Sequence, residues 1–463
     1  MEITDEIRET HAALSACSLE FLDYVCKNPE CQHRSSFALL DRGDDLVRFP
    51  LQSWPTFVSR PFRQEIVRAA VGVTRLIKSI PERFFDADPH KLASYYSLDD
   101  RYSSIMVELL KMREHVDGLI TRHDFVYSAS GFKCLECNMS SFLGGWNTGV
   151  FARWYSQIPV LQQFFSALPH GLIYTDTPRN FFLHILQQAQ GRLRIESEIN
   201  VAFVIPSGDS PRRAAVEFGR SKLREIVNYD SHRITADVVT CNYADFRDDQ
   251  SGLFLGDKRI DIVVEYTDGF ISREVFRNLL MGNIDVYNGP LSVLYSDKRN
   301  LALLSEALGS ESLSAEESSL IREFIPWTRE LKPGNTVYLG DGVNLLDLVE
   351  SLRQNLVLKP ARSAHGERVC IGHKVSAAEW SSTVRNALQE KNPWIVQEQV
   401  ESLPFLYQSG QSGATPHDLV WGFFVFGDNY AGTFLRMLPK GGSGVVNAAL
   451  GAVEGAIIEV DDP

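Results

Sequence analysis

Four polar residues at regular spacing could hold a cation beside an anion. Arg122 and Asp124 lie two positions apart, and so do Glu136 and Asn138. The segments on either side of Ala129-Ser130-Gly131 have a strand-like pattern, and a short loop that ends in Gly is typical of a β-hairpin. That hairpin places Asp124 opposite Glu136. It also places Arg122 opposite Asn138, so the four side chains share one face. Two carboxylates and an amide oxygen suit Mg2+, and an arginine beside them suits a carboxylate or phosphate. The alternative is a solvated hairpin face with one ion pair.

A lysine at the end of a strand precedes a loop of small residues. The strand is Leu356–Lys359, the loop runs to Gly366, and a second strand is expected over 368–372. Such a loop can cover phosphates with its backbone amides while the lysine meets their charge. It is not a Walker A motif, because no Gly-Lys-Ser/Thr opens a helix. His365 is interpreted as a loop residue, not as an acid or base. An ordinary hairpin is the alternative.

Polar residues end a further strand, expected over 394–400. Gln397, Glu398 and Val400 lie in this part of the chain. Backbone groups there could bind an adenine edge while the carboxylate holds the ribose. An edge strand whose polar side chains face solvent would give the same pattern.

Arg436 lies in a strand expected over 432–438, just before the Gly-rich segment 440–444. An arginine there could stabilise negative charge on a phosphoryl group during transfer. A plain surface linker would also explain the glycines.

Hydrophobic periodicity indicates the elements that must position these residues. Helices are expected over 2–25, 62–80, 99–120, 211–227, 273–281, 301–308 and 344–353. Further strands are expected over 201–205, 236–239, 260–266 and 420–426. Strands and helices alternate between about 196 and 290, which predicts a parallel sheet covered by helices.

Composition narrows the class of protein. The chain has 463 residues, which suggests more than one lobe, and a formal net charge of −13 with no basic block, which argues against duplex nucleic acid as a ligand. No apolar run approaches the length of a membrane span, and the acidic N-terminus does not resemble a secretory signal. We therefore expect a cytoplasmic protein.

The seven cysteines are sparse and odd in number, which favours reduced thiols. Cys26, Cys31 and His33 form one local cluster, and Cys134 with Cys137 forms another. The first has a loose spacing, and side chains of the second should alternate across a strand. Structural zinc is therefore disfavoured, and whether the first cluster binds anything stays open.

Taken in order, these motifs resemble glutathionylspermidine synthetase and its relatives, a circularly permuted branch of the ATP-grasp superfamily. The family pattern Arg-x-Asp followed by Glu-x-Asn matches the first motif. Tyr287-Asn-Gly-Pro290 with Ser296-Asp-Lys298 resembles the segment that carries a nucleotide-contacting lysine, although the family often has Asn in place of Asp297. The resemblance covers residues from about 115 to the end. It implies metal ligands Asp124, Glu136 and Asn138, nucleotide contacts from Lys298, Lys359, Gly366, Gln397, Glu398 and Val400, and catalytic Arg122 and Arg436.

The resemblance also implies an architecture and an activity. The expected fold is α/β, with a helical N-terminal region (1–115), a metal-ligand hairpin and helical segment (116–195), a parallel α/β pre-ATP-grasp domain (196–290) and nucleotide-binding lobes (291–463). The implied activity is ATP- and Mg2+-dependent ligation of a small-molecule carboxylate to an amine through an acyl-phosphate, with no nucleic-acid or membrane partner. Residues 1–115 match no substrate-binding feature of the family, so the substrate pair is not carried over. A homodimer is left open, and a nucleotide-binding regulator or scaffold without turnover is the alternative function.

Overall fold

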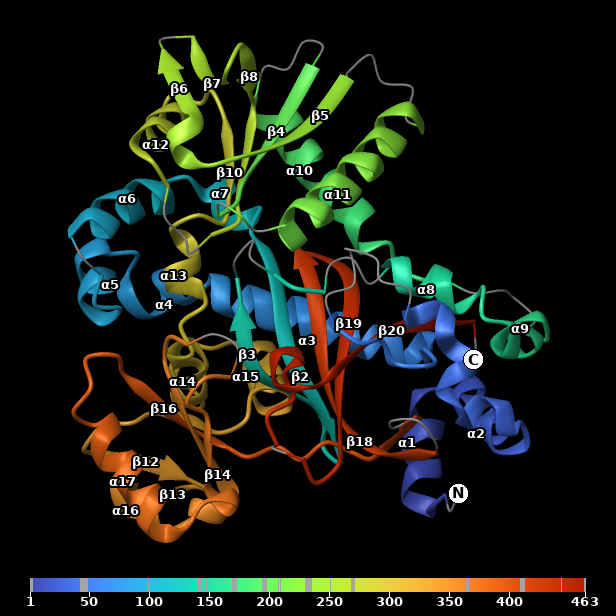
Figure 1. Cartoon of the computed structure of the whole chain (residues 1–463). Helices are drawn as coiled ribbons and strands as arrows, with labels where there is room; N and C mark the ends of the chain where they lie inside the picture. Colours follow the sequence, from blue (N-terminus) through green and yellow to red (C-terminus); the bar gives the residue numbers. More distant parts are fainter. Residues whose placement is uncertain are drawn as a thin grey trace.

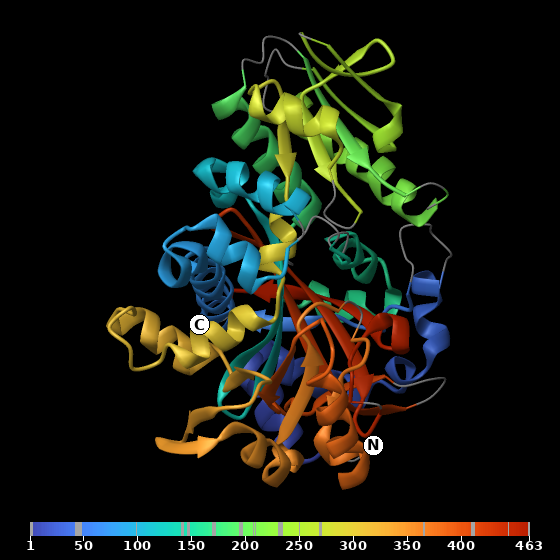
Figure 2. The same ribbon diagram turned by 90° about the vertical axis from the view of Figure 1, so that its left-hand side faces the viewer.

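The computed structural model is a mixed α/β protein with several sheets. It describes residues 3–461 apart from 42–48, 99, 140–142, 146–148, 169–172, 194–197, 207, 209, 230–234, 250, 268–270, 364–365, 409–412 and 443, so His365 lies outside the described residues. A parallel sheet lies at one end of the molecule and a small lobe at the other, with a large sheet between them (Figures 1 and 2). Across the described segments, every helix is too short or too polar to span a lipid bilayer.

A seven-stranded sheet forms the centre, in the order β1-β20-β19-β18-β2-β3, with β17 paired to part of β18. Its strands are β1 (Thr56–Ser59), β2 (Ile120–Ser128), β3 (Gly131–Asn138), β17 (Phe405–Gln408), β18 (Ala414–Phe426), β19 (Asn429–Pro439) and β20 (Val453–Val460). Only β1 and β20 pair in parallel within this described sheet. The hairpin of β2 and β3, the predicted metal-ligand hairpin, is thus joined to strands from the far end of the chain.

The N-terminal region forms seven described α-helices, of which the first three pack against this sheet and the later ones lie beside it (Figure 1). They are α1 (Asp5–Leu14), α2 (Ala16–Lys27), α3 (Arg60–Lys78), α4 (Ile80–Phe85), α5 (Pro89–Tyr95), α6 (Asp100–Lys111) and α7 (Arg113–Asp117). The single helix expected over 2–25 is wrong, because Ser15 is extended and its hydroxyl caps α2 by accepting the Ser18 N–H. The helix expected over 99–120 is likewise two short helices that end before β2 begins at Ile120.

The parallel sheet has the order β10-β9-β4-β5 and is built from β4 (Glu198–Val204), β5 (Thr235–Cys241), β9 (Ile262–Glu265) and β10 (Asp285–Tyr287). Helices α10 (Thr177–Arg192), α11 (Ser210–Tyr229) and α12 (Arg273–Leu280) accompany it, with a small sheet of β6 (Phe246–Asp249), β7 (Gly252–Leu255) and β8 (Lys258–Ile260). The strand expected over 260–266 is divided at Asp261, whose carboxylate accepts the Asn200 N–H.

The small lobe contains a sheet ordered β11-β16-β14-β15: β11 (Thr328–Glu330), β14 (Leu356–Pro360), β15 (Cys370–Ile371) and β16 (Trp394–Glu398). Beside it lie α14 (Arg299–Glu306), α16 (Leu345–Ser351), α17 (Ala377–Ala387) and the hairpin of β12 (Asn335–Tyr338) with β13 (Asp341–Asn344). Helices α13 (Leu291–Tyr295) and α15 (Ala315–Phe324) contact β3, whereas α8 (Gly149–Tyr155) and α9 (Pro159–Ser166) lie on the other side of the central sheet. The strand expected over 368–372 is shorter, because Arg368 has a φ of 60° and cannot continue an extended chain.

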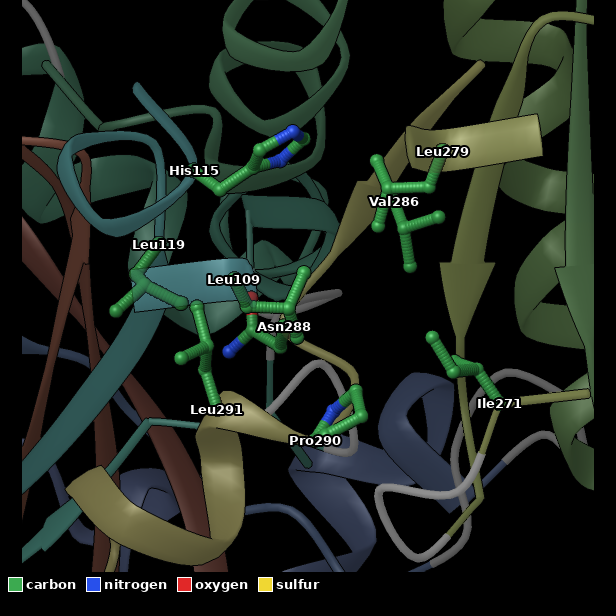
Figure 3. A pocket seen from close by; sticks show the side chains of 9 residues that line it. All are labelled: Leu109, His115, Leu119, Ile271, Leu279, Val286, Asn288, Pro290 and Leu291. Carbon is green, nitrogen blue, oxygen red and sulfur yellow. The ribbon is translucent and has the colours of Figure 1, made fainter. Parts of the chain in front are cut away.

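Asn288 joins the parallel sheet to the metal hairpin. Its side-chain amide accepts the Ile120 N–H at 3.0 Å and donates to the Ile120 carbonyl at 2.6 Å, so it binds the first residue of β2. Figure 3 shows Asn288 among apolar side chains, including Leu119 and Leu291, beside a very small pocket. This packed junction fixes where the hairpin starts.

Candidate active site

The hairpin of β2 and β3 has the predicted pairs at the site but a different path between them. Arg122 pairs with Asn138, and Asp124 pairs with Glu136. At the turn, however, Ser128 pairs with Gly131, so the register differs there by one residue from the predicted three-residue loop. A β-bulge restores the predicted register, because Leu135 is an extra residue between the Phe125–Cys134 and Asp124–Glu136 pairs. The bulge therefore turns Glu136 to the same face as Asp124.

Asp124 is buried between two arginines. Its carboxylate accepts from Arg122 Nε at 3.0 Å and lies 2.6 Å from Arg436 Nη2. The Asn138 amide is 3.4 Å from both Asp124 and Glu136. Burial alone would raise the pKa of Asp124, but the two guanidinium groups outweigh it and hold that pKa well below its ordinary value. Asp124 is therefore an anion at neutral pH.

The two arginines differ in what they contact. Arg122 Nη1 donates to the Gly144 carbonyl at 2.9 Å while the rest of its fork binds Asp124. A side chain at Gly422 would come within 3.0 Å of Arg122, so this glycine makes room for it. The Nε of Arg436, by contrast, is buried and has no hydrogen-bond partner among the described atoms. Arg436 retains a donor for a ligand.

Two lysines from the small lobe face the carboxylates. Lys298 Nζ lies 3.4 Å from Glu136 and donates to the Ser363 carbonyl at 2.9 Å. Lys359 Nζ donates to Gln397 Oε1 at 2.7 Å and to the Leu135 carbonyl at 3.3 Å. Burial lowers the pKa of Lys359 to about 8; Glu136 opposes this shift and Lys298 adds to it. The lysine ammonium groups of the small lobe thus approach the carboxylates of the β2–β3 hairpin.

A cavity of about 530 Å³ lies between these groups, within the size range of ligand pockets. The predicted residues that line it are Asp124, Glu136, Lys359, Gly366, Gln397, Glu398, Val400 and Arg436. Within the described chain, Arg122, Asn138 and Lys298 do not line it but contact residues that do. The geometry therefore gathers the four sequence motifs around one space.

Two loops close one side of the cavity. Gly366 has a φ of 72°, and a Cβ there would lie 2.6 Å from Val445. Lys374 Nζ donates to the Gly442 carbonyl, and Gly444 packs against Ile371 and Lys374. The Gly-rich segment after β19 and the loop after β14 therefore meet, and glycine is required where they approach most closely.

The cavity has lining residues that sequence motifs did not indicate. They include Val126, Leu135, His373, Lys374, Asp418 and Leu419. Aliphatic side chains are common in the lining of ligand pockets, but in the sequence they cannot be told from ordinary core residues. Asp418 stands on β18, where burial raises the pKa of its carboxyl. Alternation along β18 could have found Asp418 if that strand had been extended to Ala414.

The hairpin suits Mg2+ in chemistry and in placement. Asp124 and Glu136 lie close enough to interact directly, and the Asn138 amide touches both. Two neighbouring carboxylates with an amide form an oxygen-rich set that a hard divalent cation favours. Among the described residues, no group of three His, Cys, Asp or Glu is placed to hold a metal ion, so a cation here would need the Asn138 amide as well as the two carboxylates.

Comparisons with known proteins bear on the fold. No family model matches the chain, and no curated protein matches it. The solved structure of a glutathione synthetase-like effector from Globodera pallida matches 96% of this chain and 96% of its own, with a TM-score of 0.51 and 12% identity. A gamma-glutamylcysteine synthetase candidate from Methylobacillus flagellatus covers 84% of this chain and 88% of its own at a TM-score of 0.41 and 10% identity. At such identity the first match establishes a synthetase-like fold, and the second adds no argument.

Proposed function

We propose that this protein is an ATP-grasp ligase of circularly permuted type, which joins a small carboxylate to an amine at the expense of ATP. The observation that carries the proposal is the single cavity in which Asp124 and Glu136 face Lys359, with Lys298 behind. The order of motifs along the chain and the synthetase-like fold both support it. The proposed lobes are those expected from the sequence, with 196–290 as the pre-ATP-grasp domain.

The chain's own groups have distinct roles in this proposal. Lys298 and Lys359 bind nucleotide phosphates, and the loop at Gly366 covers them. Glu398 and Val400 face the base and ribose, whereas Gln397 orients Lys359 through its 2.7 Å hydrogen bond. Mg2+, bound by Asp124, Glu136 and Asn138, would neutralise phosphate charge.

The proposed reaction has two steps. A carboxylate oxygen attacks the γ-phosphorus of ATP, the bond to the β-phosphate oxygen breaks, and an acyl-phosphate and ADP form. The amine nitrogen then attacks the acyl carbon, loses a proton, and expels phosphate to leave an amide. Arg436 stabilises the negative charge that builds up on the acyl-phosphate, since its side chain belongs to the cavity lining.

Substrate discovery tests the proposal directly. The purified chain is incubated with ATP, Mg2+ and libraries of carboxylates and amines, while ADP formation and product masses are followed. We expect ADP formation that needs both a carboxylate and an amine, with an amide product. Nucleotide binding with no turnover across the libraries would favour the regulatory alternative, and ADP formation without an amine would indicate a phosphotransferase.

The variant Glu136→Gln tests the proposed metal site. It removes a charge and keeps the volume, so we expect an unchanged fold and turnover reduced below detection. Circular dichroism and thermal unfolding provide the control for folding. Retained activity at saturating Mg2+ would remove Glu136 from the metal site.

A further inference from the structure

Two buried thiols lie in contact beside the site. The sulfur atoms of Cys134 and Cys137 are 3.7 Å apart, and both side chains are buried. In a regular strand, residues three positions apart point to opposite faces, as the sequence suggested for this pair. The bulge at Leu135 removes that separation, because it brings Cys134 opposite Phe125 and Cys137 opposite His123 on one face. The same irregularity that orients Glu136 therefore also makes a dithiol.

The dithiol spans the residues that form the cavity wall. Leu135 and Glu136 lie between the two cysteines and point into the cavity from the other face of β3. Cys134 Sγ lies 3.6 Å from the Glu136 carbonyl. A disulfide has an S–S distance of about 2.0 Å, so forming one would draw the two ends of this four-residue segment together. The bulge would have to change shape, and Glu136 would move with it.

The strand that carries the pair lies at the edge of the sheet, where its outer side meets the small lobe through the hydrogen bond from Lys359 to the Leu135 carbonyl. β3 is the last strand of the central sheet and pairs with β2. Edge strands open locally at lower cost than central strands, so brief separation of β3 can expose both thiols without unfolding the sheet. A nucleotide that bridges Glu136 and Lys359 would oppose such opening.

We propose that Cys134 and Cys137 form a redox modification site, which a two-electron thiol oxidant converts from dithiol to disulfide and which thereby inactivates the nucleotide site. Both S–H bonds break, one S–S bond forms, and two electrons and two protons pass to the oxidant; hydrogen peroxide leaves as two waters and a diazenedicarboxamide as its hydrazine. Reduction by a dithiol reverses the change. The inactivation rests on the proposed function, whereas disulfide formation does not.

The test treats the full-length chain with diamide, with and without ADP and Mg2+, and maps its peptides without reduction. We expect a Cys134–Cys137 disulfide that forms more slowly with nucleotide present. ATP-dependent turnover, or Mg2+–ADP affinity measured by calorimetry, should fall about tenfold or more, by analogy with losses when support around a metal ligand is disturbed. Dithiothreitol should restore it.

Matched variants separate this pair from the other thiols. Cys137→Ser should keep its nucleotide affinity after diamide treatment, and Cys137→Ala serves if the serine variant folds poorly. Cys26→Ser, which removes a partly exposed thiol elsewhere, should stay as sensitive as the native chain. Intact thiols at 134 and 137 after full modification of Cys26 would overturn the proposal, as would a disulfide that leaves Mg2+–ADP affinity unchanged. A mapped disulfide in a chain that binds no nucleotide even when reduced would instead refute the proposed function and, with it, the inactivation.

Discussion

Lys359 carries its charge in a place where charge is costly. The residue is 9% exposed, and neither of its hydrogen-bond acceptors, an amide oxygen and a backbone carbonyl, is an anion. The charge of Glu136 offsets the effect of burial only in part. Burial accordingly brings the pKa of Lys359 down to about 8. A bound polyphosphate would supply the missing anion and raise that pKa again, so binding and protonation are linked.

This linkage predicts proton uptake when ATP binds. At pH 9 only about a tenth of the free protein would carry charged Lys359, if its pKa is about 8. ATP affinity should therefore weaken as pH rises above about 8, and binding at pH 9 should take up protons. Calorimetry in two buffers of different ionisation enthalpy measures the uptake. Lys359→Arg keeps the positive charge at all these pH values and should bind ATP without proton uptake. Equal proton uptake in both proteins would contradict this role of Lys359.

Arg122 and Arg436 both contact the Asp124 carboxylate, but substitution of each should have a different effect. Arg436→Lys replaces a guanidinium that belongs to the cavity lining and should lower kcat by about 100- to 1,000-fold with a smaller change in KM for ATP. Arg122→Lys loses the fork that binds Asp124 and should lower the melting temperature as well. Single-turnover acyl-phosphate formation and thermal unfolding, measured on both variants, distinguish the roles. If Arg122→Lys loses chemistry alone, Arg122 also faces the reacting centre.

The hairpin shows what a sequence can predict about an element and what it cannot. Alternating polar residues and a Gly with a φ of 83° make the strands and the site pairs predictable. The bulge at Leu135 is not predictable in this way, because Leu suits either face of a strand. The predicted pairs were confirmed because a tighter turn and a later bulge offset each other. The contact between Cys134 and Cys137 was missed for the same reason.

Other elements depend on partners far along the chain. β20 pairs with β19 and β1, and β1 comes from residues nearly four hundred positions earlier, so local periodicity gave no reason to expect either strand. The four motifs were found because their residue types are unusual. Aliphatic residues that line the cavity, such as Leu419, were not found from the sequence, because they have the same pattern as residues of the hydrophobic core.

The loop after β14 meets the Gly-rich segment after β19, and this contact gives a prediction about the two elements. Gly366→Ala places a methyl group 2.6 Å from Val445 and should separate the loops, which weakens ATP binding. Gly441→Ala is the matched control, because its φ of 89° imposes similar strain but no atom lies within 4 Å of the added methyl. Calorimetric ATP titration of both variants is the measurement. Equal losses would mean that backbone strain, not loop contact, is responsible.

In the whole molecule, the site is assembled from segments distant in sequence. The hairpin comes from residues 120–138, one lysine from the start of α14, another from β14, and Arg436 from β19. A buried cluster links two of these regions to the N-terminal helices. Asp297 accepts from Arg299 Nη2 at 2.8 Å and from Arg362 Nε at 3.2 Å, and Arg299 also donates to the Tyr95 carbonyl at 2.7 Å. The N-terminal helices are thereby tied to the loop after β14, which is the proposed phosphate loop.

This cluster predicts that stability and nucleotide binding can be separated by choosing which partner to remove. Asp297→Asn removes the carboxylate that binds two nitrogens of Arg299, which is 2% exposed and whose other ion pair is with Glu330 at 3.7 Å. Breaking a buried pair in this way costs up to about 3–5 kcal/mol. The substitution also removes the contact between Asp297 and the loop that positions Lys298. In that loop, the Ala361 carbonyl accepts the Lys298 backbone N–H and the Ser363 carbonyl accepts from Lys298 Nζ. Arg362→Gln removes only the partner whose side chain is 34% exposed, so its cost in unfolding free energy should be much smaller. Both variants should bind ATP more weakly, whereas only Asp297→Asn should show a large fall in the denaturant midpoint. Urea unfolding and ATP titration of the two proteins supply the four values needed. Normal ATP affinity in Arg362→Gln would show that the cluster supports the fold alone and does not position the phosphate loop.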